Sequence, residues 1–307
     1  MSPPTAISIL SLNVAGIKAR ERRTQLFHWL INHTSADVFL LQETHLYPAD
    51  EESTWSKDWA GYAAASLPIL ERSAWWSPSD TSRTGGSAIL IRPSRRHLFS
   101  TSQVHTSPLH RGAHTTIICE FKSAQYALHS IYAPSAPDLR LLFFNDLPTS
   151  SPPDPPNTTA VYGGDYNCVN VPGRDTRNMP HYAAPGAKEL NDFCLQRELA
   201  DAWLEQSDDQ LRAAGGGFTR HVRSTNSASR IDRIYLSAGA ALDDIVSIDV
   251  IPQPDLTDHD CVQISLTPPL RHPKPNKWRL NTSLLDDQYF LLLLECPWEV
   301  HLTHYPT

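Results

Sequence analysis

Residues suited to chemistry follow apolar runs in this chain, where predicted strands end. The clearest case is Gly163–Asn167, with the sequence GGDYN, which follows the apolar run Thr159–Tyr162. The β-branched and aromatic content of this run predicts a short buried strand, and the glycine pair is expected to end it. Asp165 and Asn167 would then emerge together at the strand tip. Because a carboxylate accepts hydrogen bonds and an amide both donates and accepts, the pair could hold a metal-activated water beside a phosphate oxygen.

Five further predicted strands carry polar residues of these kinds at an end. They are Asn13, Glu43, Tyr132, Asp232 and the pair Asp258-His259. Each one alone is typical of a turn or a solvated strand end. Together they favour a site built where strands end, because a core gives no general reason to place acids, amides and a histidine after so many apolar runs.

These residue types suit hydrolysis of a phosphodiester. Mg²⁺ takes one or two carboxylates together with waters and phosphate oxygens, which Glu43 with Asn13 or Asp258 could supply. A carboxylate is the usual partner that holds an imidazole in one tautomer, and Asp232 with His259 would make that pair.

Three more residues fit the proton transfers of the same reaction. Asp165 is placed to take or orient the proton of the attacking water. Asn167 can donate to the phosphate, and Tyr132 can donate a hydrogen bond to a developing oxyanion.

The elements that must position these residues are apolar strands and amphipathic helices. Besides 159–162, strands are predicted over 6–13, 38–41, 87–91, 115–121, 126–132, 231–236, 244–251 and 261–266. Helices are predicted around 18–31, 139–147 and 187–194. The segment between Tyr47 and Arg83, with its four tryptophans, is expected to form irregular surface loops.

Composition and charge restrict the class of protein. With 307 residues, 40% of them apolar, the chain can bury one large core as a soluble globular protein. No apolar run approaches the roughly 18 residues of a membrane span, and no secretory signal is apparent, so an intracellular location is expected. The few, widely spaced cysteines indicate neither a disulfide framework nor a zinc knuckle. The formal charge of −7 argues against holding nucleic acid by bulk positive charge, but it is compatible with a local basic rim and a bound divalent ion.

The composition changes beyond Thr267, where prolines alternate with basic residues. This composition is typical of a linker, so one domain is predicted to span residues 1–267. Residues 268–307 are predicted to form that linker and a helical tail from Trp278 to Leu294, which needs a partner to bury its leucines.

Six short motifs follow one another in a characteristic order and spacing. They are Leu12-Asn13, Gln42-Glu43-Thr44, Ile131-Tyr132-Ala133-Pro134, Gly164-Asp165-Tyr166-Asn167, Ser229-Arg230-Ile231-Asp232 and Thr257-Asp258-His259. Over residues 5–267 this series resembles the endonuclease/exonuclease/phosphatase superfamily, which includes DNase I and apurinic endonucleases of the exonuclease III type. The resemblance implies a four-layered α/β sandwich of the DNase I-like type, with two packed mixed β-sheets flanked by helices.

The same resemblance implies metal-assisted cleavage by the matched positions, with Mg²⁺ or Mn²⁺ as the ion. Glu43 would be the main metal ligand, with Asn13 and Asp258 beside it. Asp165 and Asn167 would act at the water and the phosphate, and Asp232 would support His259.

Further motifs are similar to the endonuclease domain of LINE-type non-LTR retrotransposons. They include Gln42-Glu43-Thr44-His45, Asp201-Ala202-Trp203, the Phe218-Thr219 step and the tail from Trp278 to Asp287. In such elements the tail joins the nuclease to a reverse transcriptase, which is therefore an expected partner in a parent element. Ala15 departs from the family, because apurinic endonucleases carry an acid there, and this argues against abasic-site specialisation. Phe218-Thr219-Arg220 replaces a more usual aromatic pair, which leaves the sequence preference open.

Basic residues are expected to rim the site and to track DNA phosphates. Those singled out are Arg20, Arg95, Arg96, Arg220 and Arg230. The resulting hypothesis is a monomeric, nuclear, Mg²⁺-dependent endonuclease that nicks one DNA strand and leaves a 3′ oxygen free to act as a primer. Two alternatives stay open: an abasic-site nuclease or other phosphodiesterase or phosphatase of the same fold, and a non-catalytic nucleic-acid-binding relic.

Overall fold

The computed structural model describes residues 6–47, 51–179, 185–206, 217–238, 240–253 and 255–268. The chain divides into two units, Met1–His272 and Pro273–Thr307. The second unit, with the predicted tail from Trp278 onward, lies outside the described residues. The predicted domain boundary at residue 267 therefore stays a prediction.

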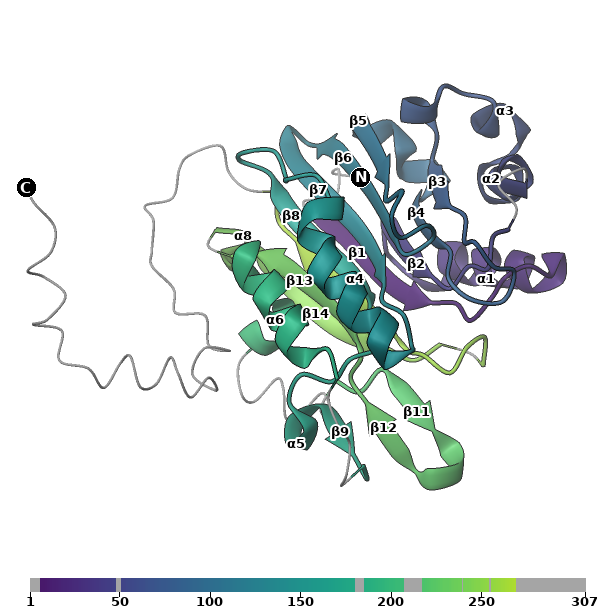
Figure 1. The fold of residues 1–307 in the computed structure, drawn as a ribbon. Helices are drawn as coiled ribbons and strands as arrows, with labels where there is room; N and C mark the ends of the chain where they lie inside the picture. The colour runs from purple at the N-terminus through teal and green to yellow at the C-terminus, as the bar shows by residue number, and fades with distance from the viewer. Residues whose placement is uncertain are drawn as a thin grey trace, which may run out of the picture. The chain divides into compact units, whose positions relative to one another are not determined.

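Two six-stranded mixed sheets form the centre of the first unit (Figure 1). Sheet A consists, in spatial order, of β14 (Ile245–Ile251), β15 (Cys261–Leu266), β1 (Ile7–Asn13), β2 (Val38–Gln42), β4 (Ser87–Ile91) and β3 (Ala74–Ser77). Sheet B consists of β10 (Leu199–Asp201), β13 (Asp232–Ser237), β8 (Thr159–Asp165), β7 (Ala124–Tyr132), β6 (His114–Phe121) and β5 (Phe99–Thr106). Only β1 with β2, and β7 with β8, pair in parallel within these two sheets.

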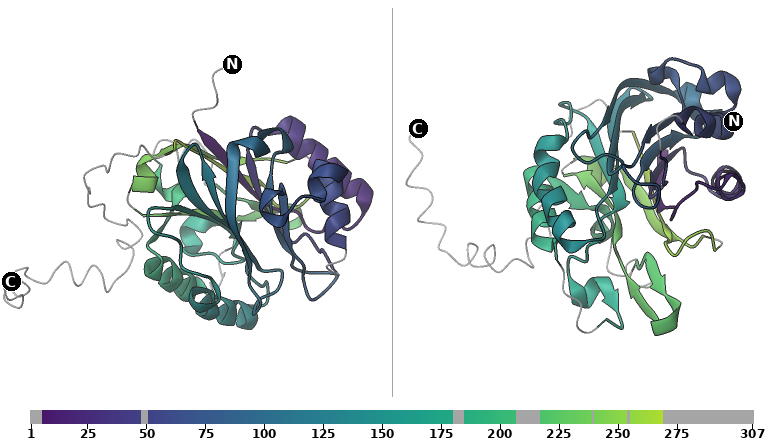
Figure 2. Two further views of the ribbon diagram at one scale, coloured as in Figure 1. Left: turned by 90° about the horizontal axis from the view of Figure 1, so that it is seen from above. Right: turned by 45° about the vertical axis from the view of Figure 1, so that its right-hand side comes forward.

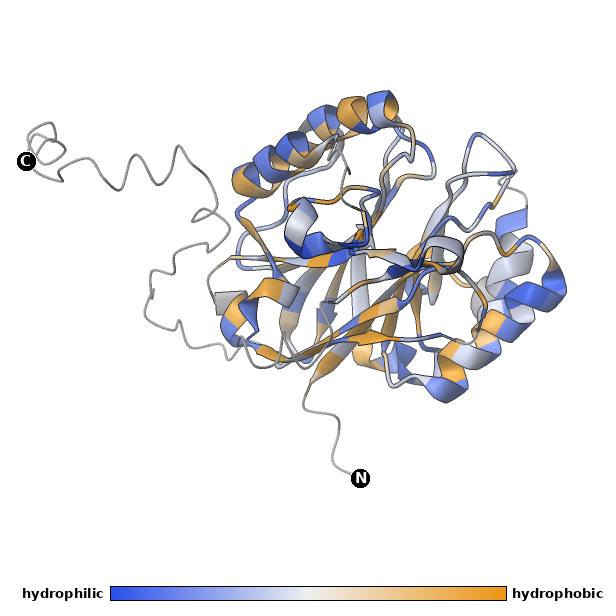
Figure 3. Ribbon diagram, turned by 90° about the horizontal axis from the view of Figure 1, so that it is seen from below, coloured by the Kyte–Doolittle hydropathy of each residue, from blue (hydrophilic) through white to orange (hydrophobic). Residues whose placement is uncertain are grey.

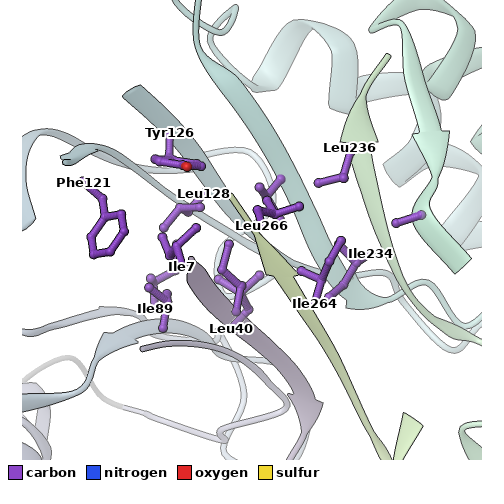
Figure 4. Packing of buried hydrophobic residues seen from close by; sticks show 14 of the residues in the cluster. Ile7, Leu40, Ile89, Phe121, Tyr126, Leu128, Ile234, Leu236, Ile264 and Leu266 are labelled. Carbon is purple, nitrogen blue, oxygen red and sulfur yellow. The ribbon is translucent and has the colours of Figure 1, made fainter. Parts of the chain in front are cut away.

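The two sheets pack face to face through a shared apolar core. Successive side chains of a strand point to opposite faces, so alternate residues of each strand enter this core. Ile7 and Leu40 of sheet A and Leu128 and Ile234 of sheet B belong to it, and all four are at most 1% exposed (Figure 4).

Helices cover the outer face of each sheet (Figure 2). α1 (Arg20–His33) and α2 (Glu52–Ala60) pack on sheet A, while α4 (Pro137–Ser150) and α6 (Ala187–Gln196) pack on sheet B. These helices carry both hydrophilic and hydrophobic residues, as one-sided burial requires, whereas the strands between them are largely hydrophobic (Figure 3). The predicted four-layered α/β sandwich is confirmed. No helix of the described residues is long and apolar enough to span a bilayer.

Shorter elements connect these layers. A small third sheet contains β11 (Arg220–Val222), β12 (Ser227–Ser229) and β9 (Thr176–Arg177). The remaining helical turns are α3 (Tyr62–Ala65), η2 (Ile69–Glu71), η3 (Pro93–Leu98), α5 (Pro172–Asp175), η4 (Ala202–Glu205), η5 (Arg223–Thr225) and α8 (Ala240–Asp243).

The prediction of irregular loops between Tyr47 and Arg83 was wrong. The segment contains α2 and β3, and its four tryptophans are at most 4% exposed. Trp59 packs edge-on against Phe27 of α1, and the indole of Trp76 donates to Ser56. Trp55, Trp59 and Trp76 thus bury α2 against sheet A, and Trp75 packs in the core between the sheets. The surrounding serines and prolines conceal these long-range roles.

The glycine pair in β8 does not end the strand, contrary to the prediction. β8 continues through Gly163 and Gly164 to Asp165. A methyl group at Gly163 would lie 2.5 Å from a Leu40 methyl of sheet A, and one at Gly164 would overlap the carbonyl of Ile131 on β7. The glycines therefore permit close packing at the end of sheet B that carries Asp165.

Candidate active site

Strand register brings three predicted site residues together on sheet B. Asp165 at the end of β8 pairs with Tyr132 on β7 and with Asp232 on β13. The two carboxylates and the phenol thus lie on adjacent strands at one end of the sheet.

Two interlocked turns place the sheet A residues at the same site. Asn13 pairs with Gln42, so Glu43 begins the turn that follows β2. Two backbone hydrogen bonds connect it to the turn after β1. Val14 N donates to the Gln42 carbonyl at 2.9 Å, and Gly16 N donates to the Glu43 carbonyl at 2.7 Å. Glu43 itself has φ of +51°, in the left-handed region. The backbone bonds between the turns therefore fix where Glu43 leaves the sheet.

A hydrogen bond between the sheets joins these two groups. The Asn13 side-chain amide donates to Asp165 Oδ2 at 2.8 Å, and its Oδ1 accepts from Ala15 N at 2.9 Å. Asn13 is therefore held at both ends. An amide oxygen has two lone pairs, so Oδ1 retains capacity to contact a cation.

Asp165 is a buried carboxyl with hydrogen bonds to both oxygens. It is 1% exposed, and its Oδ1 accepts from Asn167 N at 2.8 Å. Burial, reinforced by the negative charge of Asp232, raises the pKa of Asp165 to about 7, although His259 and the hydrogen-bond donors oppose the shift. A group with this pKa can gain or lose a proton near neutral pH, which suits general acid–base catalysis.

His259 and Asp232 form the predicted imidazole–carboxylate pair. His259 Nδ1 lies 2.9 and 3.1 Å from the two oxygens of Asp232, and Thr219 donates to Asp232 Oδ2 at 2.6 Å. Burial alone would lower the pKa of His259, but Asp232, helped by Asp165 and Asp258, raises it to about 9. The ring is therefore an imidazolium at neutral pH, with Nδ1 directed at Asp232.

Glu43 and Tyr132 lie beside each other at the opening of the site. Burial opposes ionisation of Glu43, but the neighbouring His45 imidazole and a hydrogen bond from Tyr132 lower its pKa overall. Burial and the charge of Glu43 raise the pKa of Tyr132, so the phenol keeps its proton and acts as a hydrogen-bond donor. The Glu43 side chain is 23% exposed and ionised, which suits a hydrated cation.

Asp258 is the most accessible carboxylate of the site. Its side chain is 51% exposed, and its Oδ2 lies 3.1 Å from Nε of Arg220. Its Oδ1 lies 3.9 Å from His259 Nε2. Burial opposes ionisation, but His259 and Arg220 lower the pKa of Asp258.

Two sets of side chains offer donors to a divalent ion. The first is the predicted set, Glu43 and Asp258 with the Asn13 oxygen. In the second, Asp165, Asp232 and His259 have ligand atoms within 4.8 Å of one another. Members of the second set already bond to each other, because His259 Nδ1 faces Asp232. The accessible, ionised oxygens of Glu43 and Asp258 suit Mg²⁺, a hard ion that keeps several waters.

The five arginines that were expected to contact nucleic acid lie in four different environments. Arg20 begins α1 and its side chain is 77% exposed, and Arg220 lies at the site beside Asp258. Arg95 and Arg96 follow β4 at the far end of sheet A, because Ile91 pairs with Val38 at the start of β2. These two are therefore at the opposite end of that sheet from Glu43, and they do not rim the site as predicted.

Arg230 is a clear correction, because it lies in the interior. Its side chain is 3% exposed and forms ion pairs with Asp175 at 3.1 Å and Asp201 at 2.7 Å. It cannot contact DNA from this position. Its role is to anchor the loop that leads into Asp232.

Sequence reasoning missed two residues that contact the site. The Thr219 hydroxyl accepts from Asp232 N at 3.1 Å and donates to the Asp232 carboxylate. His45 Nε2 lies 3.6 Å from Glu43 Oε2. His45 could have been found from its place two residues after Glu43, whereas Thr219 is 13 residues from its partner and carries no local signal.

Comparisons with known proteins agree with this architecture. The sequence pattern of the Endonuclease/Exonuclease/phosphatase family matches residues 10–259. The Transposon TX1 uncharacterized 149 kDa protein of Xenopus laevis is 28% identical over 296 residues, which are 95% of this chain and 20% of that protein. This chain thus spans about a fifth of that relative's length.

Two solved structures share the fold. The AP endonuclease LMAP from Leishmania major has a TM-score of 0.60 and 16% identity, over 86% of this chain and 89% of that one. An AP endonuclease from Archaeoglobus fulgidus has a TM-score of 0.61 and 15% identity, over 85% of this chain and 99% of that one. At these identities the similarity shows a DNase I-like fold and leaves the substrate open.

Proposed function

Because the chain belongs to the endonuclease/exonuclease/phosphatase family, we propose that it is a metal-dependent DNA endonuclease that nicks one strand. The observation that carries the proposal is the hydrogen bond from Asn13 to Asp165 across the two sheets. It joins the end of sheet A that carries Glu43 to the end of sheet B that carries Asp232, the partner of His259, and so supports a single site for the predicted catalytic residues. The proposal includes action as a monomer.

The roles follow from protonation states and hydrogen bonds. Asp165, with a pKa of about 7, accepts or orients the proton of the attacking water. The His259 imidazolium and the Tyr132 hydroxyl donate to the phosphate oxygens as negative charge develops. Mg²⁺ or Mn²⁺, held by Glu43 and Asp258 with Asn13, would polarise the phosphodiester and stabilise that charge.

Asn167 has a positioning role in this scheme. Its backbone N–H holds Asp165 Oδ1 at 2.8 Å, and its side-chain amide donates to the Ala133 carbonyl at 2.9 Å. A substrate phosphate would replace the second bond, so Asn167 can orient the base through its backbone N–H and the ester through its side-chain amide.

The similarity to a transposon protein supports DNA as the substrate and a mobile element as the source. The proposal therefore includes a nuclear location, a nick that leaves a 3′ hydroxyl for priming, and a reverse transcriptase as partner in a longer protein. The residues 1–267 predicted as one domain would be the nuclease.

Nicking of supercoiled plasmid in Mg²⁺ tests the proposal. We expect Glu43→Ala and His259→Ala to abolish nicking while circular dichroism stays unchanged. Glu120→Ala and His33→Ala, at exposed positions in other parts of the fold, are matched controls that should retain full activity. Unchanged nicking in both site variants would refute the proposal.

Substrate profiling separates the related activities. The protein would be assayed on intact duplex, on duplex with one abasic site, and on small phosphomonoesters and phosphodiesters. Preference for the abasic duplex, or for the small esters, would replace the proposed substrate with that class. Binding of DNA without any cleavage would indicate a non-catalytic relic.

A further inference from the structure

The His45 imidazole faces the proposed metal site and has no role in the steps described above. Its Nε2 is buried without a hydrogen-bond partner among the described residues. The atom lies 3.6 Å from Glu43 Oε2, which is longer than a hydrogen bond. Nε2 and the Glu43 carboxylate therefore form only a loose ion pair, and a cation bound by both atoms would satisfy the buried ring nitrogen.

The backbone is built to hold the ring at this place. His45 has φ of +59°, and its N–H donates to the Gly85 carbonyl at 2.9 Å. Gly16 packs on the ring, because a methyl group there would overlap His45 Nδ1. With Glu43 also left-handed, two non-glycine residues within three positions adopt a backbone conformation that is unfavourable for residues with a side chain. Such strain is characteristic of functional sites.

We propose that His45 contributes a nitrogen ligand beside Glu43 and thereby makes the site prefer transition-metal ions such as Mn²⁺ over Mg²⁺. This inference rests on the metal-dependent activity proposed above. Bonds from such ions to nitrogen and oxygen are about 2.0–2.2 Å long. Two donor atoms 3.6 Å apart therefore lie within reach of one ion.

The chemistry of the donors sets the preference. Mg²⁺ selects oxygen ligands and gives up its waters reluctantly, so an imidazole adds little to its binding. First-row transition ions accept imidazole more readily than Mg²⁺ does, with Mn²⁺ the weakest binder of the series, so the same nitrogen strengthens their binding. Only oxygen ligands come from Asn13, Glu43 and Asp258. His45 is thus the residue that would shift the preference of the site from Mg²⁺ toward transition-metal ions.

Electron spin-echo spectroscopy of the Mn²⁺-loaded protein tests the assignment without relying on activity. The wild-type spectrum should contain ¹⁴N modulation from a coordinated imidazole. The modulation should disappear in His45→Gln and persist in His259→Gln, which removes the other imidazole near the site. A wild-type spectrum without ¹⁴N coupling, or a coupling that survives His45→Gln, would overturn the proposal, and the wild-type result does not depend on any variant folding.

Metal affinities provide the second measurement. His45→Gln should weaken Mn²⁺ binding about tenfold, at the lower end of the losses seen when the surroundings of a metal are altered. Its Mg²⁺ affinity should change by less than about threefold, since imidazole is not a ligand that Mg²⁺ favours. Equal losses for both ions would show that His45 only positions Glu43. Plasmid nicking in Mg²⁺ by the wild-type protein would persist in that case, so failure of this inference is distinct from failure of the proposed function.

Discussion

Arg220 at the start of β11 forms an ion pair with Asp258, with Nε 3.1 Å from Oδ2. One partner is a predicted metal ligand, and the other is a predicted phosphate contact. Each charge is partly neutralised in the free protein, and a DNA phosphate that binds Arg220 would release Asp258 toward the cation. Binding of DNA and binding of metal should therefore favour each other.

Arg220→Ala tests this relationship. In the absence of DNA, we expect Mg²⁺ to bind the variant about two- to fivefold more tightly, since an exposed ion pair is worth at most about 1 kcal/mol. DNA binding should weaken for all sequences, as for loss of a phosphate contact. Isothermal titration measures both affinities. Arg177→Ala, in strand β9 at the other edge of the same three-stranded sheet, is the control. An unchanged metal affinity in Arg220→Ala would contradict the relationship.

The Asp232–His259 pair predicts how stability varies with pH. The pKa of His259 is about 9 in the folded protein, against 6.5 for an ordinary histidine. The stabilisation is fully present below pH 6.5 and is lost as the pH rises through 9, because the folded state holds a proton that the unfolded chain releases. The free energy of unfolding of the metal-free protein should therefore fall across this range, by up to about 1.4 kcal/mol per pH unit.

Urea denaturation at several pH values measures this slope. Other groups also make stability fall in this range, because burial raises the pKa of Asp165 to about 7 and raises the pKa of the thiols of Cys119, Cys168, Cys194 and Cys261. The contribution of His259 is therefore the difference in slope between the wild-type protein and a variant. We expect the slope between pH 7 and 9 to be smaller in His259→Gln and unchanged in His33→Gln, at the end of α1. A slope that is equal in all three proteins would exclude His259 as its source.

Most strands and helices could be predicted from local apolar patterns, whereas the four layers were implied by the resemblance to a known family. Apolar runs that end in an acid, amide or histidine identify Asn13, Glu43, Asp165 and His259 one strand at a time. The resemblance to the family, rather than these local patterns, predicted that the four residues lie close together. The pairing of the strands in the two sheets is consistent with that prediction. Arg230 illustrates what local patterns miss, because its partners Asp175 and Asp201 lie 55 and 29 residues away. A lone arginine gives the same local signal whether it is a surface charge or a buried anchor.

The buried position of Arg230 leads to a prediction on stability. Burial opposes ionisation of Asp175, but Arg230 and Arg233 hold its pKa well below the usual range. Removal of one partner from a buried ion pair typically costs about 3–5 kcal/mol, so we expect Arg230→Ala to lose that much free energy of unfolding. Arg20→Ala, at an exposed position, should change it by less than about 0.5 kcal/mol. Urea denaturation gives both values. If Arg230→Ala were as stable as the wild-type protein and had lost only affinity for DNA, Arg230 would be a DNA contact, as the sequence predicted.

Gly164 was expected to end a strand, but its lack of a side chain lets β8 approach β7. An alanine normally stabilises a strand position occupied by glycine, because it lowers the entropy of the unfolded chain. At Gly164 the added methyl would overlap the Ile131 carbonyl, so the strands must separate next to the Tyr132–Asp165 pair. We expect Gly164→Ala to lower the free energy of unfolding by about 1–3 kcal/mol, as overpacking does.

The same substitution should also impair nicking, because Asp165 is the next residue and its bonds to Asn13 and Asn167 require the present spacing. Gly173→Ala is the matched control, since a methyl group there meets no atom within 4 Å. Urea denaturation and plasmid nicking would be measured on both variants. If the two substitutions had equal effects, Gly164 would be an ordinary strand residue. The close approach of β7 and β8 would then not be what holds Asp165 in place.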